Sequence, residues 1–240
     1  MNLPKINVPT YDLTLPLTKK NIKFRPFLVK EQKILLMAVE SEDSTFINDN
    51  VKQILKNCCL SDINIDKLPV VDIEYFFLNL RARSVGEDVT LKYRCQNAPD
   101  GENKCLNVLE VDFNLLDINI DSTDIKDKIE LTNTVGIKMK YPTYGIIEKL
   151  NSSKDDSEIA FDIILDCIEF IYDQTELYNV EDISRQELTE FLENLNIDQF
   201  KKIQQFFENI PKLQKDIVTK CSKCGFEHKI HIEGLENFFE

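Results

Sequence analysis

The sequence has few of the residues on which common enzyme motifs depend. Its 240 residues include six glycines, two histidines and no tryptophan. Glycine-rich phosphate loops such as GxxxxGK[ST] and GxGxxG have no candidates, which argues against the nucleotide-binding classes that use them. No apolar run approaches about 18 residues, and the opening MNLPKINVPTYDLTLPL lacks the basic and apolar regions of a signal peptide. We therefore expect a protein that is neither exported nor inserted in a membrane.

Basic residues are outnumbered by acidic ones. The 29 Lys and Arg against 42 Asp and Glu give a formal charge of −13, and 42% of the residues are apolar, enough for a hydrophobic core. A negative field of this size repels phosphate and disfavours nucleic acid and anionic membrane surfaces. The expected partners are therefore other proteins and not nucleic acid.

The cysteines do not fit a secreted disulfide framework. There are seven, an odd number, and Cys58 and Cys59 are adjacent. Reduced thiols in a cytoplasm fit this usage better than paired disulfides.

Two hydrophobic periods alternate along the chain. Repeats of three and four residues predict helices over 29–40, 44–58, 70–84, 144–151, 157–173, 184–195 and 197–210. Alternation with period two predicts antiparallel hairpins over 87–113, 128–143 and 214–234. Ser184 and Glu187 form a capping-box pattern at the start of one helix. The predicted fold class is α+β, with helical bundle segments packed against antiparallel hairpins.

The order of these elements suggests five segments of one composite domain. Pro4, Pro9 and Pro16 favour an extended arm at the N-terminus. The expected segments are an arm (1–22), a helical part (23–86), β-hairpins with the first cysteine pair (87–145), a second helical part (146–212) and a C-terminal knuckle hairpin (213–240).

Four cysteines fall at the tips of two predicted hairpins. Cys95 and Cys105 flank the loop of the first, and Cys221 and Cys224 form a C-x2-C pair in the last. Two facing tips would supply the four thiolates that structural zinc prefers, in the manner of a zinc ribbon. Gly225 suits a knuckle because glycine adopts positive φ without strain. We therefore predict a structural Zn²⁺ held by these four residues.

Other interpretations of these residues remain open. Nine residues separate Cys95 from Cys105, more than the two to four of a standard ribbon, so four reduced thiols or a disulfide between these two are the alternatives. A redox function for the C-x2-C pair would require a helix at the first thiol, where a strand is predicted. His228 is expected on a half-buried strand face and His231 in solvent, so neither is predicted to be a ligand.

A four-thiolate centre would carry negative charge and join distant parts of the chain. It leaves no open position for water, so the metal would be structural and not catalytic. Basic residues near the cysteines can offset the added charge or simply solvate the hairpin tips: Lys92, Arg94, Lys104, Lys220 and Lys223.

Two stretches of the sequence carry a family resemblance. KFRPFLVKEQKILLMA at 23–38 and EYFFLNLRARSVGE at 74–87 resemble baseplate proteins of T4-like contractile-tailed phages, the family that includes the hub subunit and the hub assembly catalyst. The resemblance implies a non-enzymatic protein that helps to build the hub in the host cytoplasm, contacts other hub proteins and can end up in the tail baseplate. The Arg-Pro-Phe stretch at 25–27 would link the arm to the first helix. Arg81 and Arg83 would form an internal ion pair or contact a partner, and the internal role is favoured.

Two functions of other classes compete with this interpretation. A zinc-ribbon accessory factor in transcription or replication would use the same cysteines, but the acidic charge disfavours nucleic acid. A metal-dependent hydrolase would need an open coordination position, which a fourth sulfur would fill.

Overall fold

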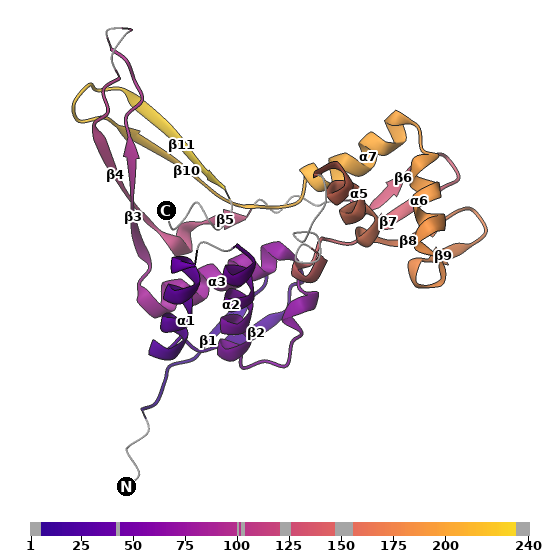
Figure 1. Ribbon diagram of the computed structural model, residues 1–240, viewed down its shortest axis with the longest axis horizontal. Coiled ribbons are helices and arrows are strands. Elements are labelled where there is room, and N and C mark those ends of the chain that lie inside the picture. The colour runs from indigo at the N-terminus through magenta and orange to yellow at the C-terminus, as the bar shows by residue number, and fades with distance from the viewer. Residues whose placement is uncertain are drawn as a thin grey trace. The chain divides into compact units, whose positions relative to one another are not determined.

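The computed structural model describes residues 6–41, 44–99, 101, 104–120, 126–146 and 156–233. These residues form helices and antiparallel sheets, which confirms the α+β class. The chain divides into two compact units (Figure 1), where one composite domain was expected. Unit 1 comprises Met1–Ile65, Val71–Asp121 and Lys212–Glu240, and unit 2 comprises Asp66–Val70 and Ser122–Pro211. Most of unit 2 is thus an insertion between two parts of unit 1.

Three helices of unit 1 follow the predicted ranges closely. They are α1 (Val29–Glu40), α2 (Ser44–Cys58) and α3 (Val70–Val85), with a 3-10 turn η1 (Ile65–Lys67) before α3. The buried ring of Phe76 on α3 meets Phe24 edge to face, with centroids 5.5 Å apart. This contact joins the helices to the strands that precede them.

Residues 11–24 form a hairpin, whereas an extended arm was expected over 1–22. Strand β1 (Tyr11–Thr14) pairs antiparallel with β2 (Asn21–Phe24). In the turn between them Leu15 is fully buried, and the buried carboxylate of Asp72 accepts hydrogen bonds from the N–H groups of Leu17 and Thr18 at 2.8 and 3.0 Å. Apolar burial and this acceptor hold the turn in place. Among the described residues of the expected arm 1–22, only 6–10 precede the hairpin.

The arginines of the two family-like stretches make internal contacts. Arg25 lies between β2 and α1, donates to the fully buried carboxylate of Glu31 at 3.0 Å and to the carbonyl of Asn57 at 3.1 Å. Arg81 donates to the carbonyl of Gly86 at 2.8 Å. Arg83 pairs with Glu87 and lies over the ring of Tyr11. These arginines therefore stabilise unit 1 itself.

Two hairpins of unit 1 face each other across an apolar layer. One joins β3 (Asp88–Arg94) to β4 (Val108–Asn114), and the other joins β10 (Leu213–Lys220) to β11 (Glu227–Glu233). After β4 a 3-10 turn η2 (Leu115–Asp117) leads to β5 (Asn119–Ile120), which pairs with the start of β10. Leu91 and Phe113 of the first hairpin share a core cluster with Leu213 and Ile232 of the second. The strands that precede and follow unit 2 in the sequence, β5 and β10, therefore pair with each other where the two hairpins begin.

Unit 2 is built on a four-stranded antiparallel sheet. In spatial order the strands are β6 (Lys128–Glu130), β7 (Gly136–Met139), β8 (Ile168–Tyr172) and β9 (Leu177–Asn179). Its helices are α5 (Asp156–Cys167), α6 (Arg185–Glu193) and α7 (Ile197–Glu208), with the 3-10 turn η3 (Val180–Asp182). Ile137, Ile168, Ile203 and Phe206 belong to one buried core of sheet and helices.

The predicted elements of unit 2 need one correction. The helix expected over 157–173 ends at Cys167, and Ile168–Tyr172 is a strand between β7 and β9. A run of isoleucines and aromatics is compatible with both the helical period and the strand period. The free edges of the neighbouring strands β7 and β9 determine that a strand forms here. The capping box of Ser184 and Glu187 is confirmed. The helix expected over 144–151 lies mostly outside the described residues.

Candidate functional site

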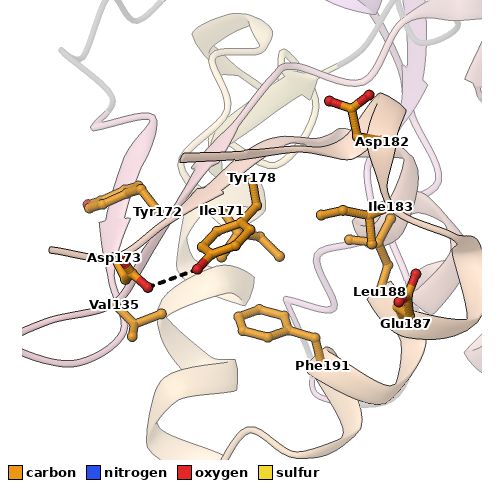
Figure 2. Close-up of a pocket in the computed structure, with 10 residues that line it drawn as sticks. All are labelled: Val135, Ile171, Tyr172, Asp173, Tyr178, Asp182, Ile183, Glu187, Leu188 and Phe191. Carbon is orange, nitrogen blue, oxygen red and sulfur yellow. Dashed lines mark hydrogen bonds between the residues drawn. The ribbon is translucent and has the colours of Figure 1, made fainter. Parts of the chain in front are cut away.

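A recess in unit 2 is lined mainly by apolar side chains (Figure 2). It has a volume of about 370 Å³ and is lined by Val135, Ile171, Tyr172, Asp173, Tyr178, Asp182, Ile183, Glu187, Leu188 and Phe191. Two of its carboxylates serve local structure. Asp173 accepts from the N–H groups of Thr175 and Glu176 and from the hydroxyl of Tyr178, and the first two hydrogen bonds do most to lower its pKa to about 2. Glu187 caps α6. Both stay ionised near neutral pH, which makes them poor proton donors.

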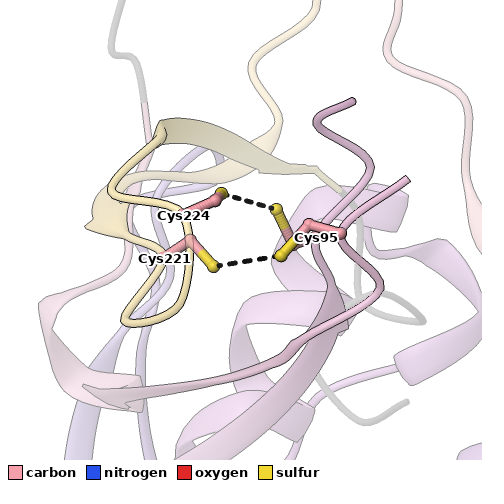
Figure 3. Close-up of side chains that lie close together, drawn as sticks. Cys95, Cys221 and Cys224 are labelled. Atoms are coloured by element: carbon pink, nitrogen blue, oxygen red, sulfur yellow. Dashed lines mark hydrogen bonds between the residues drawn. The ribbon is translucent and has the colours of Figure 1, made fainter. Parts of the chain in front are cut away.

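The four predicted cysteines come together in unit 1 (Figure 3). The sulfurs of Cys95, Cys105, Cys221 and Cys224 all lie within 4.8 Å of one another. Those of Cys95 and Cys224 are 3.7 Å apart, and those of Cys105 and Cys221 are 3.8 Å apart. Zinc–sulfur bonds of about 2.3 Å in a tetrahedron place sulfurs about 3.8 Å apart, whereas a disulfide requires about 2.05 Å. The spacing suits a tetrahedral metal centre.

The C-x2-C half of the centre closes with two backbone hydrogen bonds. Gly225, directly after Cys224, donates its N–H to the carbonyl of Cys221 at 2.8 Å. Cys221 donates its own N–H to the carbonyl of Phe226 at 2.8 Å. Gly225 has a φ of 72°, which glycine adopts at little cost. This turn places the sulfurs of Cys221 and Cys224 on the same side.

The half formed by Cys95 and Cys105 repeats this pattern despite its longer loop. Leu106, directly after Cys105, donates to the carbonyl of Cys95 at 2.9 Å, and Cys95 donates to the carbonyl of Asn107 at 2.8 Å. Leu106 has a φ of 53°, a strained conformation for a residue with a side chain. Both halves thus end in the same left-handed turn, and the nine-residue loop leaves that turn unchanged.

Three side chains direct nitrogen atoms at the sulfurs. The side-chain amide of Asn107 lies 3.5 Å from Sγ of Cys221, and that of Asn97 lies 3.6 Å from Sγ of Cys224. Nε2 of His228 lies 3.2 Å from Sγ of Cys95. The sequence did not reveal the two asparagines, and His228 was expected on a half-buried strand face and not as a ligand. Asn97 and Asn107 lie two residues after Cys95 and Cys105, respectively, and this shared spacing is the signal that the sequence offered.

These contacts separate the proton affinities of the thiols. Burial raises the pKa of Cys95 to about 12. The N–H groups of Cys224 and Lys223 lower the pKa of Cys221 to about 6, and the N–H of Phe226 is the main cause that lowers the pKa of Cys224. Negative charge is therefore accommodated best on the C-x2-C pair, where a cation would first find a thiolate.

Three of the lysines near the centre have partners on the hairpin surfaces. Lys92 pairs with Glu110 at 3.4 Å and Lys220 with Glu227 at 3.7 Å, and Lys104 donates to the side chain of Gln96 at 2.8 Å. The sulfurs instead receive amides and an imidazole. These pairings are compatible with both functions expected of the basic residues, charge compensation and solvation of the hairpin tips.

The remaining cysteines do not join the cluster. Cys58 and Cys167 are buried, and burial raises their pKa values to about 11 and about 12. Cys59 is half-buried, and burial raises its pKa as well. His231 lies at an exposed position, paired with Asp216 at 2.7 Å. Sequence reasoning therefore selected the cysteines that the fold brings together.

In the described part of the chain, no helix combines the length and apolar character needed to cross a bilayer.

Comparison with known proteins identifies the family. The family model described as "T4 bacteriophage base plate protein" matches residues 8–240, and the chain belongs to this family. It is 27% identical to the baseplate hub assembly protein gp26 of Enterobacteria phage T4 over an alignment of 234 residues. The alignment covers 96% of this chain and 98% of the T4 protein. No solved structure matches the chain significantly. The family resemblance inferred from residues 23–38 and 74–87 is thereby confirmed.

Proposed function

We propose that this protein is a non-enzymatic component in the assembly of a phage baseplate hub, and that it acts by binding other hub proteins. The observation that carries the proposal is the match to the T4 hub assembly protein along 96% of the chain. The proposed place of action is the host cytoplasm during tail assembly, and the finished baseplate is a second possible location.

A zinc-ribbon-like clasp is part of the proposal. Cys95, Cys105, Cys221 and Cys224 would hold one Zn²⁺, since their sulfur spacing fits a zinc tetrahedron. Repetition of the same turn in both halves supports a shared ligand. Four sulfurs leave no position for a substrate or water, so the metal would be structural and would keep the two hairpins in register.

Exposed apolar side chains on α1 offer a surface for a hub partner. Val29, Leu36 and Met37 are 73%, 57% and 64% exposed. Large apolar residues gathered on one exposed helix favour a protein partner, because contact would remove them from water. The acidic charge of the chain, −13, disfavours the accessory-factor alternative, which requires contact with nucleic acid.

Co-expression with the other hub proteins of the same phage tests the proposal. We expect a complex that survives affinity purification and that is weakened by the double substitution Leu36→Glu and Met37→Glu. Val218→Glu is the matched control, because Val218 is 61% exposed on the β10–β11 hairpin. A protein that binds no hub component would overturn the assembly role, and equal behaviour of both variants would overturn the use of α1.

Metal analysis tests the clasp separately. The purified protein should contain one zinc per chain, and Cys221→Ser should lose it. Cys167→Ser is a control, because Cys167 is outside the cluster.

A further inference from the structure

Two asparagine side chains reach from one hairpin to the sulfurs of the other. The amide of Asn97, in the loop of the β3–β4 hairpin, lies 3.6 Å from Sγ of Cys224 on the β10–β11 hairpin. The amide of Asn107, at the other end of the same loop, lies 3.5 Å from Sγ of Cys221. Each asparagine thus contacts a sulfur that is 127 or 114 residues away in the sequence.

The backbone holds the two asparagines in equivalent positions. Cys95 donates its N–H to the carbonyl of Asn107 at 2.8 Å, and Cys105 donates its N–H to the carbonyl of Asn97 at 2.7 Å. Both asparagines are half-buried. Their main chains are therefore tied to the cysteines of their own hairpin, while their side chains contact the cysteines of the opposite hairpin.

An asparagine amide suits this position chemically. A zinc ion bound by four thiolates leaves net negative charge on the sulfurs. Donors around the ligands orient them and withdraw part of that charge. The amide nitrogen of asparagine carries two hydrogens that it can donate, whereas the carboxylate of aspartate, which has the same shape, can only accept. Exchange of one for the other therefore separates hydrogen bonding to the sulfur from packing against it.

We propose that Asn97 and Asn107 are positioning residues for the metal, and that their amides hold the sulfurs of the C-x2-C pair in place from the opposite hairpin. This rests on the proposed zinc clasp. His228 makes the converse contact, because its Nε2, on the β10–β11 hairpin, lies 3.2 Å from Sγ of Cys95. The two hairpins then hold each other through side-chain contacts as well as through a shared metal, and zinc affinity depends on both.

Isosteric substitution at Asn97 tests the proposal. Asn97→Asp keeps the shape of the side chain but places an acceptor oxygen beside Sγ of Cys224. Zinc affinity of the purified chain, measured by competition with a chromophoric chelator, should fall about tenfold for Asn97→Ala and about a hundredfold for Asn97→Asp. The same order is expected for Asn107→Ala and Asn107→Asp at Cys221. A side chain that only filled space would give the reverse order, with alanine the worse substitution.

Gln96→Glu is the matched control. It adds the same negative charge at the residue next to Asn97. The side chain of Gln96 is exposed and accepts a hydrogen bond from Lys104 at 2.8 Å, so solvent and this lysine screen the added charge. Zinc affinity should change less than about threefold.

Cobalt substitution reports on the sulfurs directly. Removal of a donor leaves more charge on the thiolate, so the thiolate-to-cobalt charge-transfer band of Co²⁺-loaded protein should move to lower energy in Asn97→Ala and Asn107→Ala and stay unchanged in Gln96→Glu. Asn97→Asp with wild-type zinc affinity, or an unmoved band in both alanine variants, overturns the inference and leaves the clasp intact. Wild-type protein that binds no zinc overturns both.

Discussion

Removal of zinc should loosen the tips of the two hairpins and leave their bases folded. Among the described residues, the tip core has Cys95, Leu109 and Cys221 as its buried members. The base core contains eight buried residues, among them Leu91 and Phe113. If the proposed clasp holds zinc, the tips should therefore depend on the metal far more than the bases do.

The size of this effect follows from burial and mass action. In the described part of the tip cluster, Leu109 is the buried aliphatic side chain, and its burial contributes about 1.5 to 3 kcal/mol. Zinc at a free concentration of about 100 times its dissociation constant adds about 2.7 kcal/mol. Chelation should thus raise the equilibrium population of open tips about a hundredfold.

Hydrogen exchange read by mass spectrometry measures this difference. The reporter amides are those of Cys95, Cys105, Leu106, Cys221 and Gly225, whose hydrogen bonds close the two turns. Their exchange should accelerate about a hundredfold on chelation, whereas peptides over the β3–β4 base should change less than about threefold.

Cys221→Ser is the control, since its exchange should not respond to chelator. Equal acceleration of tips and bases, or unchanged tips after metal analysis has established that zinc is gone, would refute the reasoning.

Two further predictions concern the turns and a buried ion pair. Gly225→Ala should weaken zinc binding by about 1 to 2 kcal/mol in competition titrations, because it introduces a side chain at φ 72°. Leu106→Gly should not weaken zinc binding, because it relieves backbone strain at φ 53°. Equal losses of affinity in the two variants would contradict the assignment of matching turns. Glu31→Gln should lower the free energy of unfolding by about 3 kcal/mol in urea, because it breaks the pair with Arg25; Lys30→Gln, at a 69% exposed side chain, should cost less than about 0.5 kcal/mol, and similar costs would argue against the pair. Burial raises the pKa of Glu31, but the hydrogen bonds from Arg25 and Leu28 outweigh it, so the folded pKa lies below the ordinary 4.5. The Glu31 carboxylate therefore binds a proton more tightly in the unfolded chain than in the folded one. The stabilisation from its pair with Arg25 is present above about pH 4.5 and is lost as the pH falls through the folded pKa. Acid titrations of the free energy of unfolding should therefore differ between wild type and Glu31→Gln in this pH range.

Local sequence patterns determine several of the helices in both units. The three helices begin and end close to the predicted residues, because their apolar stripes are long enough to fix the period. The capping box of Ser184 and Glu187 was equally readable, since both partners lie within one turn.

Features that depend on distant residues could not be predicted in the same way. The turn after β1 is held by Asp72, which is 54 and 55 residues from the groups that it binds. Strand β8 forms because β7 and β9 supply partners on both sides. The cysteine set was predictable from spacing, but the left-handed turn at Leu106 and the donor roles of Asn97 and Asn107 depend on how two separate hairpins meet.

The insertion of unit 2 between the two cysteine pairs delays synthesis of the second pair relative to the first. Cys105 and Cys221 are 116 residues apart. A ribosome that adds about 5 to 20 residues per second needs roughly 6 to 23 seconds to cover that distance. Residues 122–211 can fold during this delay while Cys95 and Cys105 wait as an incomplete pair. Closure of the centre would then come late in biogenesis, after the inserted unit has left the ribosome.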